Sequence, residues 1–276
     1  MKDYNWSEDT FNDIDWTAHG RALRRHDNHR PTMVKYLNKV LPVGAFLHKT
    51  NPKYYAGCPS CNNPSETRHH LMECSSPERI KWREKCYSAV LAYVQKKDTS
   101  PKIQGLLLSG LKVCLHHQNP TTIQEDPSWD TLKQAQDAIG WHHLLKGRIS
   151  KQFSQEQDRY LNMKKTATKR NNGLTWLTGL IDIIYKEWWK LWDMRNQDRH
   201  GHDMRTKSQA KKAQAIRQLT QFYEAYQQEV PEHLEWLFQI PLESRMQLNT
   251  PVIIQFLNTW EPVLQESHYT TALETG

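Results

Sequence analysis

Apolar residues recur at intervals of three and four along almost the whole chain and almost nowhere alternate with polar ones. This spacing places them on one face of a helix, whereas a half-buried strand would need a period of two. Gly and Pro residues divide the pattern into separate helical segments. The sequence therefore predicts a mostly α-helical, multi-helix protein. We expect helices over 77–97, 129–145, 147–166, 174–200, 206–228 and 250–265, with a short apolar segment at 103–115.

The segment 118–128 contains Pro120 and Pro127 and lacks the helical spacing. Because proline interrupts helices, we interpret this segment as a linker loop. It would separate an N-terminal helical region, 1–117, from a second helical domain, 129–276.

Three cysteines and one histidine form the strongest chemical signal in the chain. Cys58, Cys61, His70 and Cys74 follow the pattern C-x2-C-x8-H-x3-C. Two thiolates two residues apart can share one metal ion from a tight turn, and residues four apart lie on one face of a helical turn. The pattern predicts a knuckle loop at about 56–76, near the N-terminus, in which these four residues hold one structural Zn²⁺. His69 is the alternative ligand if the loop is irregular.

Two further cysteines, Cys86 and Cys114, fall in apolar segments. Cysteine is often a small buried apolar residue, so we expect both in the core. We expect Trp188 and Trp192 in the core as well, because they lie four residues apart and follow an apolar stripe.

Charge is distributed unevenly along the chain. The 37 Lys and Arg residues exceed the 30 Asp and Glu residues, which gives a net charge of +7. The segment 146–170 has eight basic and two acidic residues, whereas 224–276 has eight glutamates and one arginine. A basic centre followed by an acidic tail indicates a surface for a polyanion, although solvated helix faces would give the same pattern.

We therefore expect RNA or DNA as a partner, bound mainly through its phosphates. The candidate contact residues are Lys146, Arg148, Lys151, Lys164, Lys165, Lys169, Arg170, Arg205, Lys207, Lys211 and Lys212.

The Cys/His pattern continues into Pro77, Arg79 and the pair Trp82-Arg83. With Glu66-Thr67 and His70-Leu71, this run resembles the zinc-binding C-terminal region found downstream of the reverse transcriptase in non-LTR-type retroelement polyproteins. Further tryptophan-rich segments are similar to the tails of such elements in unicellular algae, so the resemblance covers nearly the whole chain. It implies a retroelement-derived tail that contacts element RNA or target DNA beside a reverse transcriptase polypeptide, which is thus an expected partner.

We expect no enzymatic activity. The paired aspartates of a polymerase site are missing, since no Asp-Asp pair occurs in the chain. Two alternatives are open. Arg195, Asn196 and His200 match the R-N-x3-H pattern of HEPN ribonuclease domains, in which His200 would act as acid or base and Arg195 would hold the phosphate. Alternatively, the chain is a helical protein-interaction module in which zinc only stabilises the fold.

No run of apolar residues approaches the roughly 18–20 that a membrane span needs. The first residues also lack the apolar stretch of a secretory signal. We therefore expect an intracellular protein, nuclear or cytoplasmic.

Overall fold

The computed structural model describes residues 6–61, 63–116, 119–123, 126–201, 204–228 and 230–274. Most of these residues are helical, and the β-structure among them is one isolated bridge between Ile14 and Ser150. The predicted mostly α-helical, multi-helix fold is confirmed. The α-helices are α1 (Glu8–Asp13), α2 (Trp16–Arg24), α3 (Arg30–Leu37), α4 (Gly44–Thr50), α5 (Arg68–Glu73), α6 (Pro77–Lys96), α7 (Pro101–His116), α8 (Asp130–Ile139), α9 (Lys151–Met163), α10 (Gly173–His200), α11 (Met204–Tyr226), α12 (Leu242–Met246) and α13 (Thr250–Glu274). Short 3-10 helices are η2 (Asp27–His29), η3 (Pro120–Thr122), η4 (Pro127–Trp129), η5 (Trp141–Lys146) and η6 (Glu232–Phe238).

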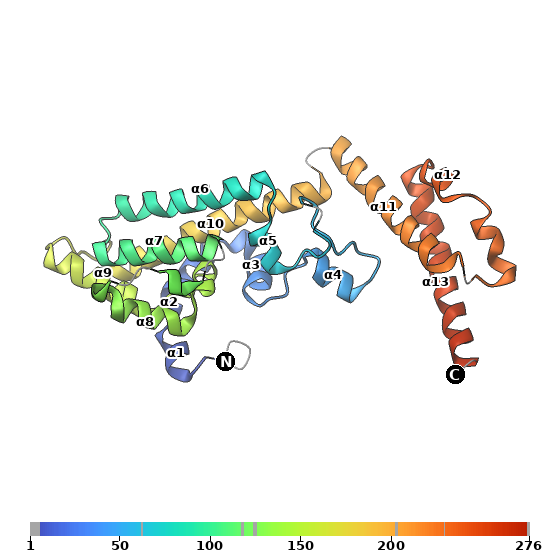
Figure 1. The fold of residues 1–276 in the computed structure, drawn as a ribbon. Helices are drawn as coiled ribbons and strands as arrows, with labels where there is room; N and C mark the ends of the chain where they lie inside the picture. Colours follow the sequence, from blue (N-terminus) through green and yellow to red (C-terminus); the bar gives the residue numbers. More distant parts are fainter. Residues whose placement is uncertain are drawn as a thin grey trace.

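Helix α10 is the central element of the fold and packs against α2, α6 and α9 (Figure 1). Its first turn is capped by Asn172, whose side chain accepts a hydrogen bond from the Thr175 N–H. It ends at Gly201, whose φ of 85° is a conformation that glycine adopts without steric cost. With 28 residues at about 1.5 Å each, α10 is about 42 Å long.

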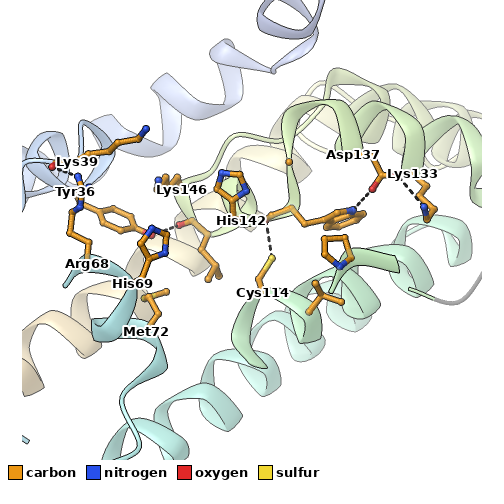
Figure 2. Close-up of a pocket in the computed structure, with 15 residues that line it drawn as sticks. Tyr36, Lys39, Arg68, His69, Met72, Cys114, Lys133, Asp137, His142 and Lys146 are labelled. Atoms are coloured by element: carbon orange, nitrogen blue, oxygen red, sulfur yellow. Dashed lines mark hydrogen bonds and ion pairs between the residues drawn. The ribbon is translucent and has the colours of Figure 1, made fainter. Parts of the chain in front are cut away.

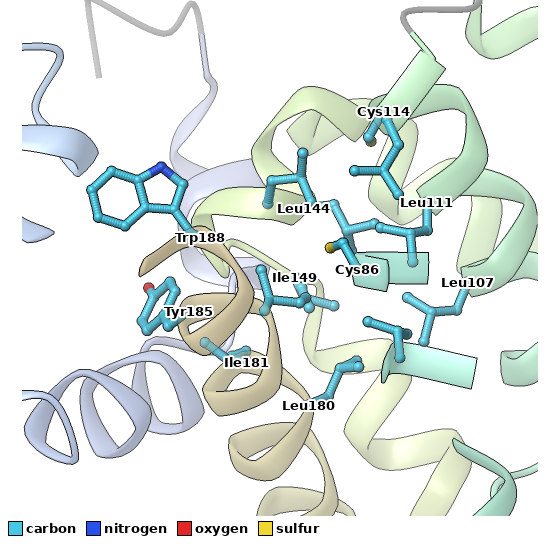
Figure 3. Close-up of a cluster of buried hydrophobic side chains, with 14 of the residues drawn as sticks. Cys86, Leu107, Leu111, Cys114, Leu144, Ile149, Leu180, Ile181, Tyr185 and Trp188 are labelled. Atoms are coloured by element: carbon cyan, nitrogen blue, oxygen red, sulfur yellow. The ribbon is translucent and has the colours of Figure 1, made fainter. Parts of the chain in front are cut away.

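The main hydrophobic core forms where α6 and α10 run antiparallel, with α2, α7, α9 and η5 around them. Figure 3 shows part of this core, including Trp188 and the two cysteines Cys86 and Cys114. All three are buried, and so is Trp192, which confirms the sequence-based expectation for these four residues. The burial of their apolar surface is what holds the helices together.

The region predicted as one helix, 129–145, contains a break. Helix α8 ends at Ile139, Gly140 takes a φ of 94°, and Trp141 begins η5. The break turns the Trp141 ring onto α7 beside Gly110, where a Cβ atom would lie only 1.8 Å from the ring. A straight helix is therefore replaced by two short ones because the indole packs against a glycine of a neighbouring helix.

A second, smaller core lies after α10. It is built from α11, η6 and α13, with residues such as Leu219, Phe222 and Leu257 buried in it. Figure 1 shows α11, α12 and α13 at one end of the molecule, beyond the C-terminal end of α10. The acidic segment after Glu224 thus packs mainly on its own cluster, and it reaches the earlier part of the chain through an ion pair of 3.0 Å between Glu261 and Lys53.

The predicted linker, 118–128, does not coincide with a break in hydrophobic packing. Ile123 belongs to the main core, and so do buried residues on both sides of it, such as Leu111 and Leu144. Residues 118, 124 and 125 of this segment lie outside the described part of the chain. In the described residues, the change from one core to the next falls between α10 and α11.

Within the described residues, no helix combines the length and the apolar character that crossing a membrane requires.

Candidate metal centre and basic surfaces

The Cys/His motif folds into a short loop followed by one helical turn. The Cys58 N–H donates to the carbonyl of Asn63 at 2.8 Å, which closes the loop that carries Cys61. Thr67 then caps α5 by accepting a hydrogen bond from the His70 N–H at 3.0 Å. Because α5 begins at this point, His70 lies on its first turns and Cys74 directly follows its end.

The four predicted ligands come together. Their candidate ligand atoms all lie within 4.8 Å of one another, with Cys58 and Cys74 buried and the other two half-buried. The Sγ atoms of Cys58 and Cys74 are 3.8 Å apart, and Cys61 Sγ lies 3.2 Å from Nε2 of His70. This Cys₃His group can hold a metal ion. His69 is exposed and lies outside it.

These distances fit a tetrahedral metal. Zn–S bonds of about 2.3 Å at tetrahedral angles place two sulfur atoms about 3.8 Å apart, and a sulfur and an imidazole nitrogen about 3.6 Å apart. The Cys58–Cys74 separation matches the first value, and Cys61 and His70 would need to separate by a few tenths of an ångström. A metal with four protein ligands has no open position for water, so this donor set suits a structural ion.

One thiol of the group is poised to lose its proton. The hydrogen bond from Cys58 lowers the pKa of Cys74 to about 6, while the same contact raises the pKa of Cys58. The Ser76 backbone N–H also favours the Cys74 thiolate. Deprotonated sulfur is the form that ligates metal.

Side chains from the C-terminal part of α10 hold the metal-binding loop in place. Arg195 is 3% exposed, and its guanidinium makes two charge-assisted hydrogen bonds, of 2.8 and 2.7 Å, to the carboxylate of Glu66, which is 1% exposed. Glu66 also accepts from the Gly44 N–H at 2.6 Å. The bidentate pair therefore ties the loop between α4 and α5 to α10.

Two further arginines strengthen this attachment. Arg199 on α10 donates to the carbonyl of Tyr55 at 2.7 Å and to that of Gly57 at 3.2 Å, directly before the first cysteine. Arg79 on α6 is buried and donates to Asp198 at 2.8 Å, and Asp198 accepts from Ser60 at 2.6 Å. The loop is thus attached to both long helices of the core.

This attachment accounts for the arginine of the R-N-x3-H pattern. Arg195 is buried against Glu66 and also donates to the adjacent Asn196 at 3.2 Å and to the Pro42 carbonyl at 3.4 Å. His200 is exposed at the end of α10, where partial burial and the nearby arginines lower its pKa. A HEPN-type site needs the arginine to face a phosphate in solvent, whereas here it faces a buried carboxylate.

The basic residues predicted to contact nucleic acid fall into three groups. In the first, Arg148 is 6% exposed and donates to the Leu37 carbonyl and to His143, so it belongs to the interior and not to a surface. Lys146 is half-buried and lines a pocket. Both residues are predicted phosphate contacts on the basis of charge alone. Charge does not show that the segment 146–150 passes through the core.

The second group lies on α9 and on the loop between α9 and α10. Lys151 is exposed at the start of α9 and donates to the Asn12 carbonyl. Lys164 pairs with Asp98 at 2.7 Å. Lys165, Lys169 and Arg170 are exposed.

The third group lies on the first half of α11. Arg205, Lys207 and Lys211 are exposed, and Lys212 is half-buried and donates to the Leu248 carbonyl. No acidic residue occurs among 204–217. We call the three exposed residues of this group the α11 block, and Lys165, Lys169 and Arg170 the loop block.

The two blocks lie at opposite ends of α10. The loop block directly precedes the N-terminus of this helix, and the α11 block directly follows its C-terminus, so about 42 Å of helix separates them (Figure 1). Helix α11 contacts the segment that leads into the metal-binding loop through its second half. Further along the same helix, the Arg217 guanidinium lies 4.5 Å from the Tyr55 ring, and Gln218 donates to the Lys53 carbonyl at 2.9 Å.

Comparisons of the chain with protein-family models, with curated proteins and with solved structures found no match.

Sequence reasoning missed the residues that position the site. Glu66 lies inside the Cys/His motif, and its occurrence between a Pro-Ser turn and an N-cap gave no sign that it is buried. Its partner Arg195 is 129 residues away, and only the tertiary structure pairs them.

Proposed function

We propose that the chain is a zinc-binding, non-catalytic nucleic-acid-binding module of the kind that accompanies the reverse transcriptase in non-LTR-type retroelement polyproteins. The observation that carries the proposal is that the Cys₃His group forms, and that the helix bearing the α11 block also contacts Tyr55 and Lys53 just before the first cysteine. The sequence resemblance described above supports the retroelement origin, and it also makes a reverse transcriptase polypeptide a candidate partner.

Zinc is the metal that this donor set favours. Three thiolates and one imidazole in a tetrahedral arrangement are typical of structural zinc sites, whereas magnesium and calcium prefer oxygen ligands. The short helices α4 and α5 bury little apolar side chain: their buried residues are Gly44, which has none, and Leu71. A metal ion would therefore supply order that packing alone provides only weakly here.

Phosphate contacts fit the exposed basic residues of α11 better than base contacts do. Lysine and arginine side chains on a helix reach the backbone of a nucleic acid and release counterions when they bind. Such contacts fix position and carry no direct sequence information. We therefore expect binding that is strong at low salt and has little base specificity.

The zinc proposal is tested by metal analysis of protein purified without chelator. We expect about one zinc per chain, and we expect Cys61→Ser to lose most of it, because the serine hydroxyl is a poor zinc ligand. Cys114→Ser is the matched control, since Cys114 is buried in the core away from the motif, and it should keep the metal. Zinc-free wild-type protein, or equal zinc in both variants, would refute the site.

Nucleic-acid binding is tested by fluorescence anisotropy with labelled single-stranded RNA and with duplex DNA across a salt series. We expect the logarithm of the association constant to fall linearly with the logarithm of the salt concentration. The RNA is checked for length after incubation and should be intact. Flat affinity across the salt series, or no binding at low salt, would contradict the proposal and favour a protein-interaction module. Shortened RNA would contradict the non-catalytic part of it.

A further inference from the structure

A pocket of about 690 Å³ lies between α5, α7, α8 and η5 (Figure 2). Its size is within the range typical of sites for small organic ligands. Segments that are far apart in the sequence contribute to its lining, from Tyr36 near the end of α3 to Lys146 at the end of η5. Neither the metal centre nor the basic blocks use it.

One end of the pocket is strongly cationic. Lys39, Arg68 and Lys146 line it, together with His69 and His142. Figure 2 shows His142 and Lys146 next to each other on η5, with His69 and Arg68 facing them from α5. The Arg68 guanidinium donates to the Lys39 carbonyl, so the two residues are held together at this end of the pocket. Clustered cationic donors of this kind are what phosphate-binding sites provide.

The charge of the pocket is not balanced by its own acidic residues. Its lining includes four Lys or Arg side chains and one carboxylate, Asp137, so the balance is 4 − 1 = +3 with neutral histidines. Asp137 is itself engaged, because it pairs with Lys133 at 2.9 Å and accepts from the Trp141 indole at 2.6 Å. That carboxylate lies at the end of the pocket away from Lys146 (Figure 2).

Lys146 is affected both by burial and by the neighbouring positive charges. Burial first, and then the charges of Arg148, Lys39 and Arg68, lower its pKa to about 8. Among the described residues, its ammonium group has no hydrogen bond or ion pair. A half-buried cation that its neighbours repel would gain from an anion in the pocket.

The remainder of the lining is apolar. Met72, Val113 and Leu145 present aliphatic or thioether surface, and Pro120 and Trp141 also line the pocket. An inorganic anion would use the cationic end only. A ligand that carries both a phosphate and a flat, weakly polar ring would fill the whole pocket.

We propose that this pocket binds a nucleoside 5′-monophosphate group, with its phosphate at Lys39, Arg68 and Lys146 and its ring against the apolar end. The group can come from a free nucleotide or from the 5′-phosphorylated end of a strand, since both present the same chemistry. The site is distinct from the α11 block, and neither proposal depends on the other.

Isothermal titration calorimetry at neutral pH and low salt tests this assignment, with adenosine 5′-monophosphate, inorganic phosphate and adenosine as the three probes. The monophosphate is expected to bind at one site and more tightly than either part alone, because only it fills both ends. No detectable binding of the monophosphate would overturn the proposal. Equal affinity for inorganic phosphate would overturn the nucleotide assignment.

Variants test the location of the site. Lys146→Gln should weaken binding of the monophosphate by about tenfold or more, since it removes a charge-assisted contact, while Lys146→Arg should retain most of it. Because the folded protein disfavours the charged form of Lys146, the glutamine variant is also expected to melt at a higher temperature without ligand. A loss of binding together with a gain in stability separates a ligand site from a merely structural lysine.

Lys165→Gln, in the exposed loop block, is the matched control and should bind the monophosphate like the wild type. Unchanged affinity in both Lys146→Gln and Lys39→Gln would place the ligand elsewhere and overturn the proposal. A variant of the α11 block should also keep monophosphate binding, so failure of this proposal is distinguishable from failure of the nucleic-acid proposal.

Competition distinguishes the two sources of the ligand. If a 5′-phosphorylated oligonucleotide displaces the monophosphate from the pocket and its 5′-hydroxyl counterpart does not, the pocket recognises strand ends. If neither oligonucleotide displaces it, the pocket takes the free nucleotide. Both results support the site.

Discussion

Single charged residues in the interior decide how the metal-binding loop is held. The carboxylate of Glu66 is buried and has two hydrogen bonds from Arg195 and one from a backbone N–H. Taking both charges out of water is costly, and their pairing offsets that cost only while both partners are present. The pair therefore specifies where the loop lies against α10 more than it adds net stability.

Replacing Glu66 with alanine should lower the free energy of unfolding by about 3–5 kcal/mol, because Arg195 would be left buried without its counter-charge. Urea denaturation of the zinc-loaded protein measures this. The double variant Glu66→Gln/Arg195→Met should lose less than Glu66→Ala, since no unpaired charge stays buried. A loss below about 1 kcal/mol in Glu66→Ala would show that the pair is not coupled to folding.

Buried histidines make the protein sensitive to acid. His143 is 2% exposed, and its Nδ1 lies 3.2 Å from the Arg148 guanidinium, which can only donate, so the imidazole is neutral. Burial, and then the charges of His142 and Lys146, lower its pKa well below the ordinary 6.5. Below pH 6.5 the unfolded chain binds a proton that the folded chain does not, so stability falls as the pH falls.

We therefore expect the melting temperature to decrease from pH 7.5 to pH 5.5, and to decrease less in His143→Gln, whose amide oxygen can accept from Arg148 without titrating. Thermal denaturation at the two pH values measures the difference. Protonation of the metal ligands affects the wild type and the variant alike, so the comparison isolates His143. An identical decrease in both proteins would contradict this account.

At the scale of helices, strong local sequence signals are sufficient to predict where a helix begins or ends. Pro77 at the first turn of α6 and Gly201 after α10 are start and stop signals that can be recognised without the structure. The spacing of the cysteines and His70 likewise identified the metal-binding group, because a loop and one helical turn suffice to bring these residues together. These features depend on contacts that are close in sequence.

Where packing between distant segments determines the local structure, the sequence is not sufficient to predict helix breaks or the burial of charged residues. The continuous helix predicted over 129–145 is wrong at Gly140, because the Trp141 ring packs beside Gly110 on another helix. The charge of Arg148 predicts a surface position, yet its side chain is buried and donates a hydrogen bond to the Leu37 carbonyl. Neither contact can be recognised from the residues that are adjacent in the sequence.

Removal of the metal should affect specific elements and not the whole fold. Chelation is expected to increase hydrogen exchange in α4, in α5 and in the last turns of α10, where Arg195 and Arg199 hold the loop. The first half of α10 should stay protected, because Leu177, Leu180 and Ile181 are buried in the main core. Hydrogen–deuterium exchange with and without chelator measures this.

Cys114→Ser serves as the control in the same experiment and should show the same chelator response as the wild type. Exchange that increases evenly over the chain would mean that the metal holds the whole fold. Exchange that does not change anywhere would mean that the Cys₃His group orders nothing.

At the scale of the whole molecule, the structure separates features that the sequence places close together. The basic segments around residues 146–170 and 205–217 flank α10 in the sequence, and the length of this helix sets them about 42 Å apart. The pocket shows the reverse, since residues from distant segments converge on it. Sequence patterns predicted neither arrangement, because each depends on how several helices pack.

The measurement that tests the central claim most directly compares two triple variants with the wild type in the salt dependence of duplex DNA binding. One variant, Arg205→Gln/Lys207→Gln/Lys211→Gln, neutralises the α11 block, and the other, Lys165→Gln/Lys169→Gln/Arg170→Gln, removes the same charge from the loop block. The account predicts that the α11 variant binds more weakly and that its salt slope is smaller by up to about 2.7, or about 0.9 for each lost phosphate contact. The loop variant should change less. An α11 variant with wild-type affinity and slope would contradict the account, and so would a loss found only in the loop variant.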